Sequence, residues 1–161
     1  MATTTLNDIT FSVEPGQQGM TMSKVFDAPR DLVFKAHTDP ALIPNWWGPR
    51  KYKTVVDNLD AKSGGAWRFL NVDSDGNEYA FHGVFHDVSF PTRIIQTFEW
   101  EGMPGHVSMD TYLFEEVDGK TRLTCTSVFQ SIEDRDGMAQ SGAQEGGIET
   151  WERLAEVVAA L

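Results

Sequence analysis

The feature that most constrains the fold is a run of strand-like segments that fills the middle of the chain. Between residues 52 and 130, segments of strand composition are separated by short stretches rich in glycine, proline and aspartate. Turns this short join antiparallel neighbours, because a parallel connection needs a crossover of a dozen or more residues. The six strands predicted in this way are 52–61, 66–72, 78–88, 93–101, 106–116 and 120–130.

The chain before this region adds further strand signals. Residues 6–13 alternate loosely between apolar and polar side chains and are interpreted as an edge strand or flexible arm within residues 1–19. Residues 20–26 are predicted to be the first main strand. Because no repeat, linker or low-complexity tract interrupts the 161 residues, we expect one domain, 1–161, with a core of its own.

Two short helices are expected directly after the first main strand. Asp27 is a suitable N-cap, and Pro29 fits the first turn of a helix over residues 29–38. The start signal repeats at Asp39, and Gly48 with the following proline closes the second helix.

After residue 130 the apolar spacing becomes helical and continues to the end of the chain. Bulky residues occupy one stripe near the C-terminus, at Trp151, Leu154, Ala155, Val158 and Leu161. Upstream the same stripe carries small residues, at Ala139, Gly142, Ala143, Gly146 and Gly147. Each glycine inside a helix costs roughly 1 kcal/mol relative to alanine. We therefore expect the small residues to leave a hollow for a ligand, the alternative being that aromatic rings pack onto them.

This order of elements predicts an α+β fold. A curved antiparallel sheet of about six or seven strands has one face to bury, and the C-terminal helix is the only long amphipathic element. The helix must therefore lie across the sheet, with the two short helices completing one end.

Several motifs also carry a family resemblance. They are FDAPRDLVFKAHTDP (26–40), ALIPNWWGP (41–49), AWRF (66–69), HGVF (82–85) and DGMAQSGAQEGGIETWERL (136–154). The sequence resembles the START-like (SRPBCC) superfamily, and within it the homologues of the activator of heat-shock protein 90 ATPase. The resemblance implies a helix-grip fold with a cavity between helix and sheet. It implies no single activity, because carriers, cyclases and interaction domains share this fold.

Alternation along the strands and the family likeness together give a candidate binding site. Aromatic residues share a face on each of three strands, and small residues of the helix lie opposite. The predicted ligand-binding residues are Trp46, Trp67, Phe69, Phe81, Phe85, Gln96, Phe98, Trp100, Gly142, Gly146 and Gly147. In the alternative interpretation the rings are ordinary core. Of the adjacent Trp46 and Trp47, at most one is expected to reach the cavity, and Gln96 is the candidate for orienting a ligand.

Signals for catalysis or for a metal are weak. The sequence contains no nucleophile elbow, zinc-binding motif or phosphate loop. Cys125 is expected to be an inert strand thiol, and His82 and His86 would lie about 13 Å apart on a regular strand, too far for one metal. Glu99 could act as an acid or base only if it were buried, and alternation sends it to solvent. We expect no catalytic residue, no metal and no cofactor.

Charge and composition restrict the partners. Thirteen basic against twenty-four acidic residues give a formal charge of −11, which disfavours nucleic acid and anionic membranes. A single cysteine fits a reducing compartment, and the N-terminus lacks the pattern of a secretory signal. The predicted location is the cytoplasm.

Three functions remain open at this point. The favoured one is binding of a small hydrophobic or aromatic molecule in the cavity, without chemistry. The second is a cyclase or dehydratase that uses the same cavity, and the third is a stress-related, co-chaperone-like interaction domain. A homodimer is expected if an edge strand and aromatic residues are exposed.

Overall fold

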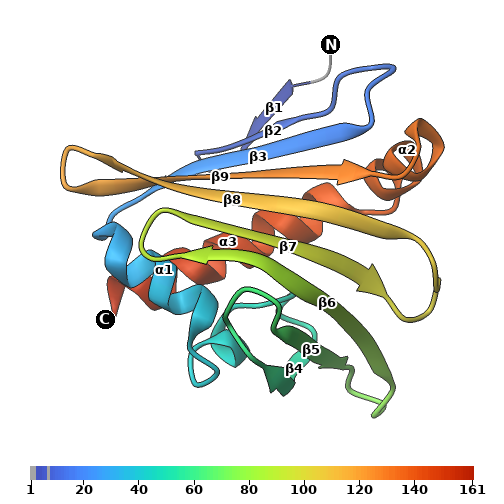
Figure 1. Ribbon diagram of the computed structural model, residues 1–161, viewed down its shortest axis with the longest axis horizontal. Coiled ribbons are helices and arrows are strands. Elements are labelled where there is room, and N and C mark those ends of the chain that lie inside the picture. Colours follow the sequence, from blue (N-terminus) through green and yellow to red (C-terminus); the bar gives the residue numbers. More distant parts are fainter. Residues whose placement is uncertain (1–2, 7) are drawn as a thin grey trace.

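A computed structural model describes residues 3–6 and 8–161 and shows one antiparallel sheet of nine strands (Figure 1). The strands are β1 (Thr3–Leu6), β2 (Ile9–Ser12), β3 (Gly19–Phe26), β4 (Lys53–Leu59), β5 (Ala66–Val72), β6 (Glu78–Ser89), β7 (Arg93–Trp100), β8 (Val107–Val117) and β9 (Lys120–Phe129). Their order across the sheet is β1-β2-β3-β9-β8-β7-β6-β5-β4. The six strands predicted for the middle of the chain are confirmed to within two residues at each end.

The N-terminal prediction is wrong in one respect. Residues 6–13 form no single edge strand, because β1 and β2 pair as a hairpin and β2 then pairs with β3. Asp8 adopts a positive φ of 64°, which turns the chain between the two strands. The sheet therefore has nine strands in place of six or seven. Residues 1, 2 and 7 of the predicted arm lie outside the described residues.

The two short helices follow β3 as expected. They are α1 (Arg30–Thr38) and a single 3₁₀ turn, η1 (Ile43–Asn45). Pro29, rather than the predicted Asp27, occupies the N-cap position of α1. Proline fits there because its missing N–H would have no helical partner.

The C-terminal segment is two helices, which corrects the prediction of one continuous helix. These are α2 (Ile132–Gln140), capped by the Ser131 side chain, and α3 (Ala143–Ala159). Gly142 separates them with φ 86°, a conformation that glycine adopts without steric cost. Gly142 is thus a helix breaker, and the helical stripe is not continuous through it.

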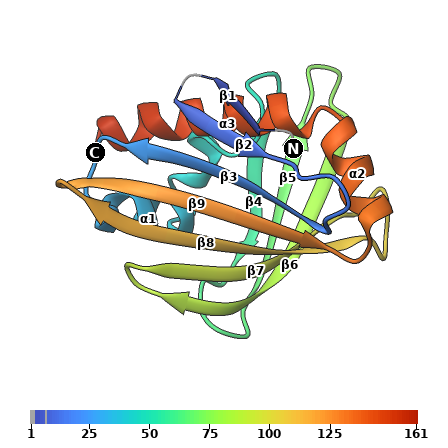
Figure 2. The ribbon, with the colours of Figure 1, turned by 90° about the horizontal axis from the view of Figure 1, so that it is seen from above.

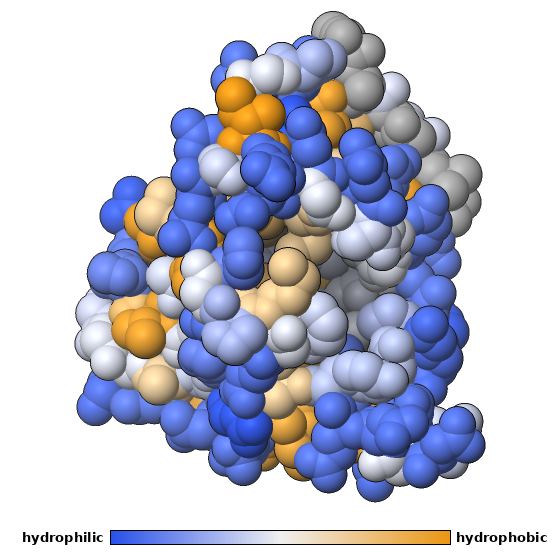
Figure 3. All heavy atoms as spheres, turned by 90° about the vertical axis from the view of Figure 1, so that its right-hand side faces the viewer, coloured by the Kyte–Doolittle hydropathy of each residue, from blue (hydrophilic) through white to orange (hydrophobic). Residues whose placement is uncertain are grey.

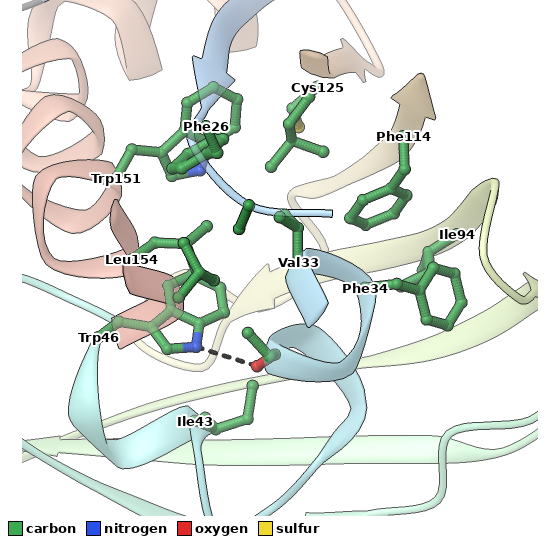
Figure 4. Close-up of a cluster of buried hydrophobic side chains, with 14 of the residues drawn as sticks. Phe26, Val33, Phe34, Ile43, Trp46, Ile94, Phe114, Cys125, Trp151 and Leu154 are labelled. Carbon is green, nitrogen blue, oxygen red and sulfur yellow. Dashed lines mark hydrogen bonds between the residues drawn. The ribbon is translucent and has the colours of Figure 1, made fainter. Parts of the chain in front are cut away.

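The curved sheet wraps around α3, with α1 at one end of the molecule and α2 at the other (Figures 1 and 2). The solid core lies toward α1, where Trp151 and Leu154 of α3 are almost fully buried (Figure 4). The rings of Trp151 and Phe26 meet edge to face at 5.7 Å. The indole N–H of Trp46 donates to the Ala36 carbonyl over 3.0 Å, which closes this end of the core.

In the part of the chain that the structure describes, no helix has the length and apolarity needed to cross a lipid bilayer.

Candidate ligand-binding cavity

A cavity of about 190 Å³ lies between the inner face of the sheet and the N-terminal half of α3. Residues of β2, β3, β7, β8, β9, α2 and α3, together with Trp47, form its wall. They are Phe11, Met20, Thr21, Met22, Trp47, Gln96, Phe98, Ser108, Asp110, Tyr112, Cys125, Ser127, Phe129, Met138, Ala143 and Gly147. Figure 3 views the molecule from the end at which α2 lies, and weakly hydrophobic atoms appear at the centre of a mostly hydrophilic face.

Small side chains on both layers create this space. On the helix, Ala143 and Gly147 face the sheet, and a β-carbon at Gly147 would lie 3.2 Å from Sδ of Met22. On the sheet, Ser108 and Ser127 occupy inward positions of β8 and β9. Because neither layer fills the gap, a hollow remains beside the N-terminal half of α3. The C-terminal half, by contrast, packs solidly against the sheet.

One acidic side chain, Asp110, belongs to the cavity wall. It is 6% exposed, and the Ser108 hydroxyl donates to its Oδ1 over 3.2 Å. Burial raises the pKa of Asp110 to about 6, although hydrogen bonds from Ser127 and Ser108 act in the opposite direction. The carboxyl group is therefore largely ionised above pH 6, inside a mostly apolar space.

Two further groups on the wall stay neutral. Burial raises the pKa of the Cys125 thiol and also raises the pKa of the Tyr112 phenol well above its usual value. A thiol held in its protonated form is a poor nucleophile. Cys125 thus serves as a small wall residue, in line with the expectation of an inert thiol.

A second, smaller cavity of about 20 Å³ adjoins the first and shares Trp47, Gln96 and Tyr112 with it. His37 lines this space: its Nδ1 donates to the Val33 carbonyl over 2.8 Å, and its buried Nε2 has no hydrogen-bond partner among the described residues. Burial lowers the pKa of His37 to about 4, so the ring is neutral near pH 7. A volume of this size suits about one water molecule.

Trp47 determines where the cavity ends. Its ring lies 5.1 Å from that of Phe69, 5.3 Å from that of Phe81 and 6.2 Å from that of Trp67. The Trp47 carbonyl accepts a hydrogen bond of 2.5 Å from the Thr54 hydroxyl, which holds the segment against β4. Apart from the smaller cavity, the inner face of β5 and β6 is therefore filled by side chains, and the larger cavity lies over β3, β7, β8 and β9.

The structure divides the predicted site residues into four groups, of which three lie in or beside the two cavities. Gln96, Phe98 and Gly147 are on the wall of the larger cavity. The smaller cavity is lined by Trp46, Trp67, Phe69, Phe85 and again Gln96. Phe81 stacks on Phe98, with ring centroids 5.5 Å apart, as part of the aromatic packing around Trp47.

Three predicted residues lie elsewhere. Trp100 is 37% exposed at the end of β7, with its ring against Gly102. Gly142 is exposed at the helix break, and a β-carbon at Gly146 would point toward Pro49 at 3.9 Å. Gly146 faces away from the cavity because it precedes Gly147 by one residue, a rotation of about 100° around the helix.

Sequence reasoning missed most of the wall on β8 and β9. The available signal was the inward alternation Ser108, Asp110, Tyr112 on one strand and Cys125, Ser127 on its neighbour. Small polar side chains on the buried face of paired strands indicate unfilled volume between the sheet and the helix. The prediction was based on aromatic residues instead, and aromatic rings fill such a volume.

The helix α2 supplies Met138 to the wall and is fixed by a buried arginine. Arg135 is 1% exposed, and its Nη1 donates to the Gly19 carbonyl over 2.9 Å, next to Met20 on the wall. Its Nε donates to Asp136. This pairing keeps α2 against the start of β3 at the edge of the cavity.

The other polar clusters are outside the cavity. Glu99 accepts from the Gly105 amide and lies 3.4 Å from the Nε2 of His82, while Glu101 binds Arg68 and His82. Among residues 3–6 and 8–161, no group of three or more His, Cys, Asp and Glu residues is arranged to hold a metal ion.

A long helix held against a curved antiparallel sheet, with a cavity between them, defines a START-like helix-grip protein. A family model described as activator of Hsp90 ATPase homolog 1-like protein matches residues 27–159. The chain therefore belongs to this family. No curated protein sequence matches the chain.

Solved structures support the same fold. A protein from Arthrobacter aurescens superposes with a TM-score of 0.86 at 23% identity, over 94% of this chain and 91% of that one. A protein from Rhodobacter sphaeroides gives a TM-score of 0.86 at 24% identity, over 94% and 99%. DynU16, from the dynemicin biosynthetic locus, gives 0.70 at 19% identity, over 89% of this chain and 48% of its own.

Proposed function

We propose that this protein binds a small hydrophobic or aromatic molecule in the cavity between α3 and the sheet. The observation that carries the proposal is the hollow of about 190 Å³, in which half of the lining residues are aromatic or methionine. An apolar cavity of about 150 Å³ in another protein accepts benzene. The space here therefore suits a ligand of one or two rings.

The proposed contacts come from both layers. Phe98 and Phe129 offer aromatic rings, and Met20, Met22 and Met138 offer adaptable side chains that can fit ligands of different shape. Gln96, which was predicted to orient a ligand, lies on the wall shared by both cavities. Membership of a helix-grip family supports a ligand in this position, because in this fold the cavity lies between the long helix and the sheet.

The cavity is tested by filling it from the helix side. In Gly147→Leu, the new side chain would enter the space next to Met22. We expect the affinity for the neutral two-ring fluorophore 1-naphthylmethanol to fall about tenfold or more, measured by isothermal titration calorimetry. The matched control is Gly137→Leu, because Gly137 is exposed on α2 with open space around its β-carbon position.

The control separates loss of space from loss of structure. Gly137→Leu should bind the fluorophore like the natural protein, and both variants should retain the same circular dichroism spectrum. Unchanged binding in a folded Gly147→Leu protein would contradict the proposal, as would absence of binding in the natural protein.

A second candidate function is a cyclase or dehydratase acting in the same cavity. It is favoured by one specific observation, namely that Asp110 faces the cavity with two hydroxyl partners and a pKa near neutrality. Such a carboxylate can accept a proton from a substrate. The likeness to DynU16 from a biosynthetic locus is compatible with this function.

The remaining expectations stay predictions. The cytoplasmic location rests on the sequence features given above. A homodimer could form along the free edge of β4, where Val55 is 38% exposed. An interaction with a chaperone is the third candidate function, and it rests on the family resemblance.

A further inference from the structure

A polar row crosses the middle of the inner face of the sheet. Gln96 of β7 is paired directly with Asp110 of β8, and Asp110 with Ser127 of β9. Directly opposed residues on neighbouring strands have β-carbons about 5 Å apart and share one face. All three side chains line the larger cavity, so the row forms a compact polar surface inside it.

Within residues 3–6 and 8–161, the carboxylate in this row has hydrogen-bond donors but no positive partner. The hydroxyls of Ser108 and Ser127 donate to Asp110. None of the wall residues found among the described part of the chain is a lysine, arginine or histidine. A buried carboxylate without a cation is unfavourable, and a bound cation would offset that cost.

The surroundings of Asp110 also favour a positive charge. Phe98, Tyr112 and Phe129 are neighbours of the row in the strand register, and ring faces attract cations. The whole chain carries a formal charge of −11, so its field attracts cations toward the cavity and repels anions.

We infer that the molecule bound in this cavity is an organic cation, a hydrophobic or aromatic amine whose ammonium group donates to Asp110. This inference rests on the proposed function and specifies its ligand class. The rings of the ligand lie against Phe98, Phe129 and the methionines, and the Gln96 amide oxygen can accept a second ammonium hydrogen.

The same geometry makes recognition dependent on pH. Because burial raises the pKa of Asp110 to about 6, the carboxylate loses its charge as pH falls through that value. The other titratable groups facing it, Tyr112 and Cys125, stay neutral since burial raises both pKa values. On α2 and α3, the wall residues are Met138, Ala143 and Gly147, which do not titrate.

The test compares two probes of the same shape, 1-naphthylmethylamine and 1-naphthylmethanol, by isothermal titration calorimetry at pH 7.5. We expect the amine to bind about tenfold more tightly or better, as for a charge-assisted hydrogen bond. In Asp110→Asn the two affinities should agree within about twofold. Glu116→Gln, an equal change of charge at an exposed position of β8, should keep the preference.

A measurement on the natural protein alone guards against a variant that fails to fold. Between pH 7.5 and pH 5.0 the amine preference should fall about tenfold, because the ionised fraction of a group with pKa near 6 falls by that factor. The amine itself stays charged over this range.

Three results would overturn the inference: equal binding of amine and alcohol at pH 7.5, a preference that survives in Asp110→Asn, or one that is unchanged at pH 5.0. If 1-naphthylmethanol binds and 1-naphthylmethylamine does not, the cation inference fails while the proposed function stands. If neither probe binds, both fail.

Discussion

At the scale of single residues, Asp110 reduces stability while giving the cavity its one charge. A carboxyl group has a pKa of 3.8 when solvated, and burial raises that of Asp110 to about 6 in the folded protein. Between these values the folded state holds the proton more strongly than the unfolded state, so stability falls as pH rises from about 4 to about 6. Above pH 6 the full penalty remains, roughly 3 kcal/mol for a shift of about two units.

Replacement of Asp110 by asparagine should therefore stabilise the protein at high pH. We expect Asp110→Asn to raise the free energy of unfolding by about 1–3 kcal/mol at pH 8, and to change it little near pH 4, where the natural carboxyl group is also neutral. Urea unfolding followed by tryptophan fluorescence at both pH values measures the difference. A less stable variant at pH 8 would show that Asp110 contributes to the fold instead of weakening it.

The residue scale also shows what sequence could reveal about the site. Alternation correctly turned Gln96 and Phe98 inward, because side chains on a strand point to opposite faces in turn. It could not tell that the Trp47 ring would pack against Phe69 and Phe81, since that contact joins segments far apart in the chain. The boundary between the filled half and the hollow half of the inner face depends on the Trp47 ring.

At the scale of elements, the joint between α2 and α3 places the small residues over the cavity. Gly142 holds φ at 86°, and this change of direction lets α3 start at Ala143 above β3. The helical pattern in the sequence runs through this point without a change of period. A single sequence does not distinguish a glycine inside a helix from a glycine at which a helix ends. The break between α2 and α3 was therefore not predicted.

Two glycine variants distinguish the broken helix from a continuous one. Gly142→Ala should destabilise the protein by about 1 kcal/mol, because a β-carbon disfavours positive φ. Gly137→Ala, within α2 and with open space, should stabilise it by up to about 1 kcal/mol. Thermal unfolding at pH 7 checks both signs. A continuous helix would make both variants more stable, and that result would contradict the break.

At the scale of the whole molecule, one end is a packed core and the other a hollow. The strands were predictable because hairpin turns and alternation are local properties of the sequence, and β5 begins and ends at the predicted residues. The position of the hollow depends on how β3, β8 and β9 meet α3. That arrangement follows from tertiary packing, which local patterns do not contain.

The methionines test the central claim, that the space between α3 and the sheet is the ligand site. Met20, Met22 and Met138 line the cavity, whereas Met103 and Met109 are 51% and 45% exposed elsewhere. Methyl spectra of protein labelled with ¹³C at methionine should be recorded during titration with the neutral probe 1-naphthylmethanol. We expect the signals of Met20, Met22 and Met138 to shift together and those of Met103 and Met109 to stay in place. Shifts confined to Met103 or Met109, or no shift at saturation, would contradict the account.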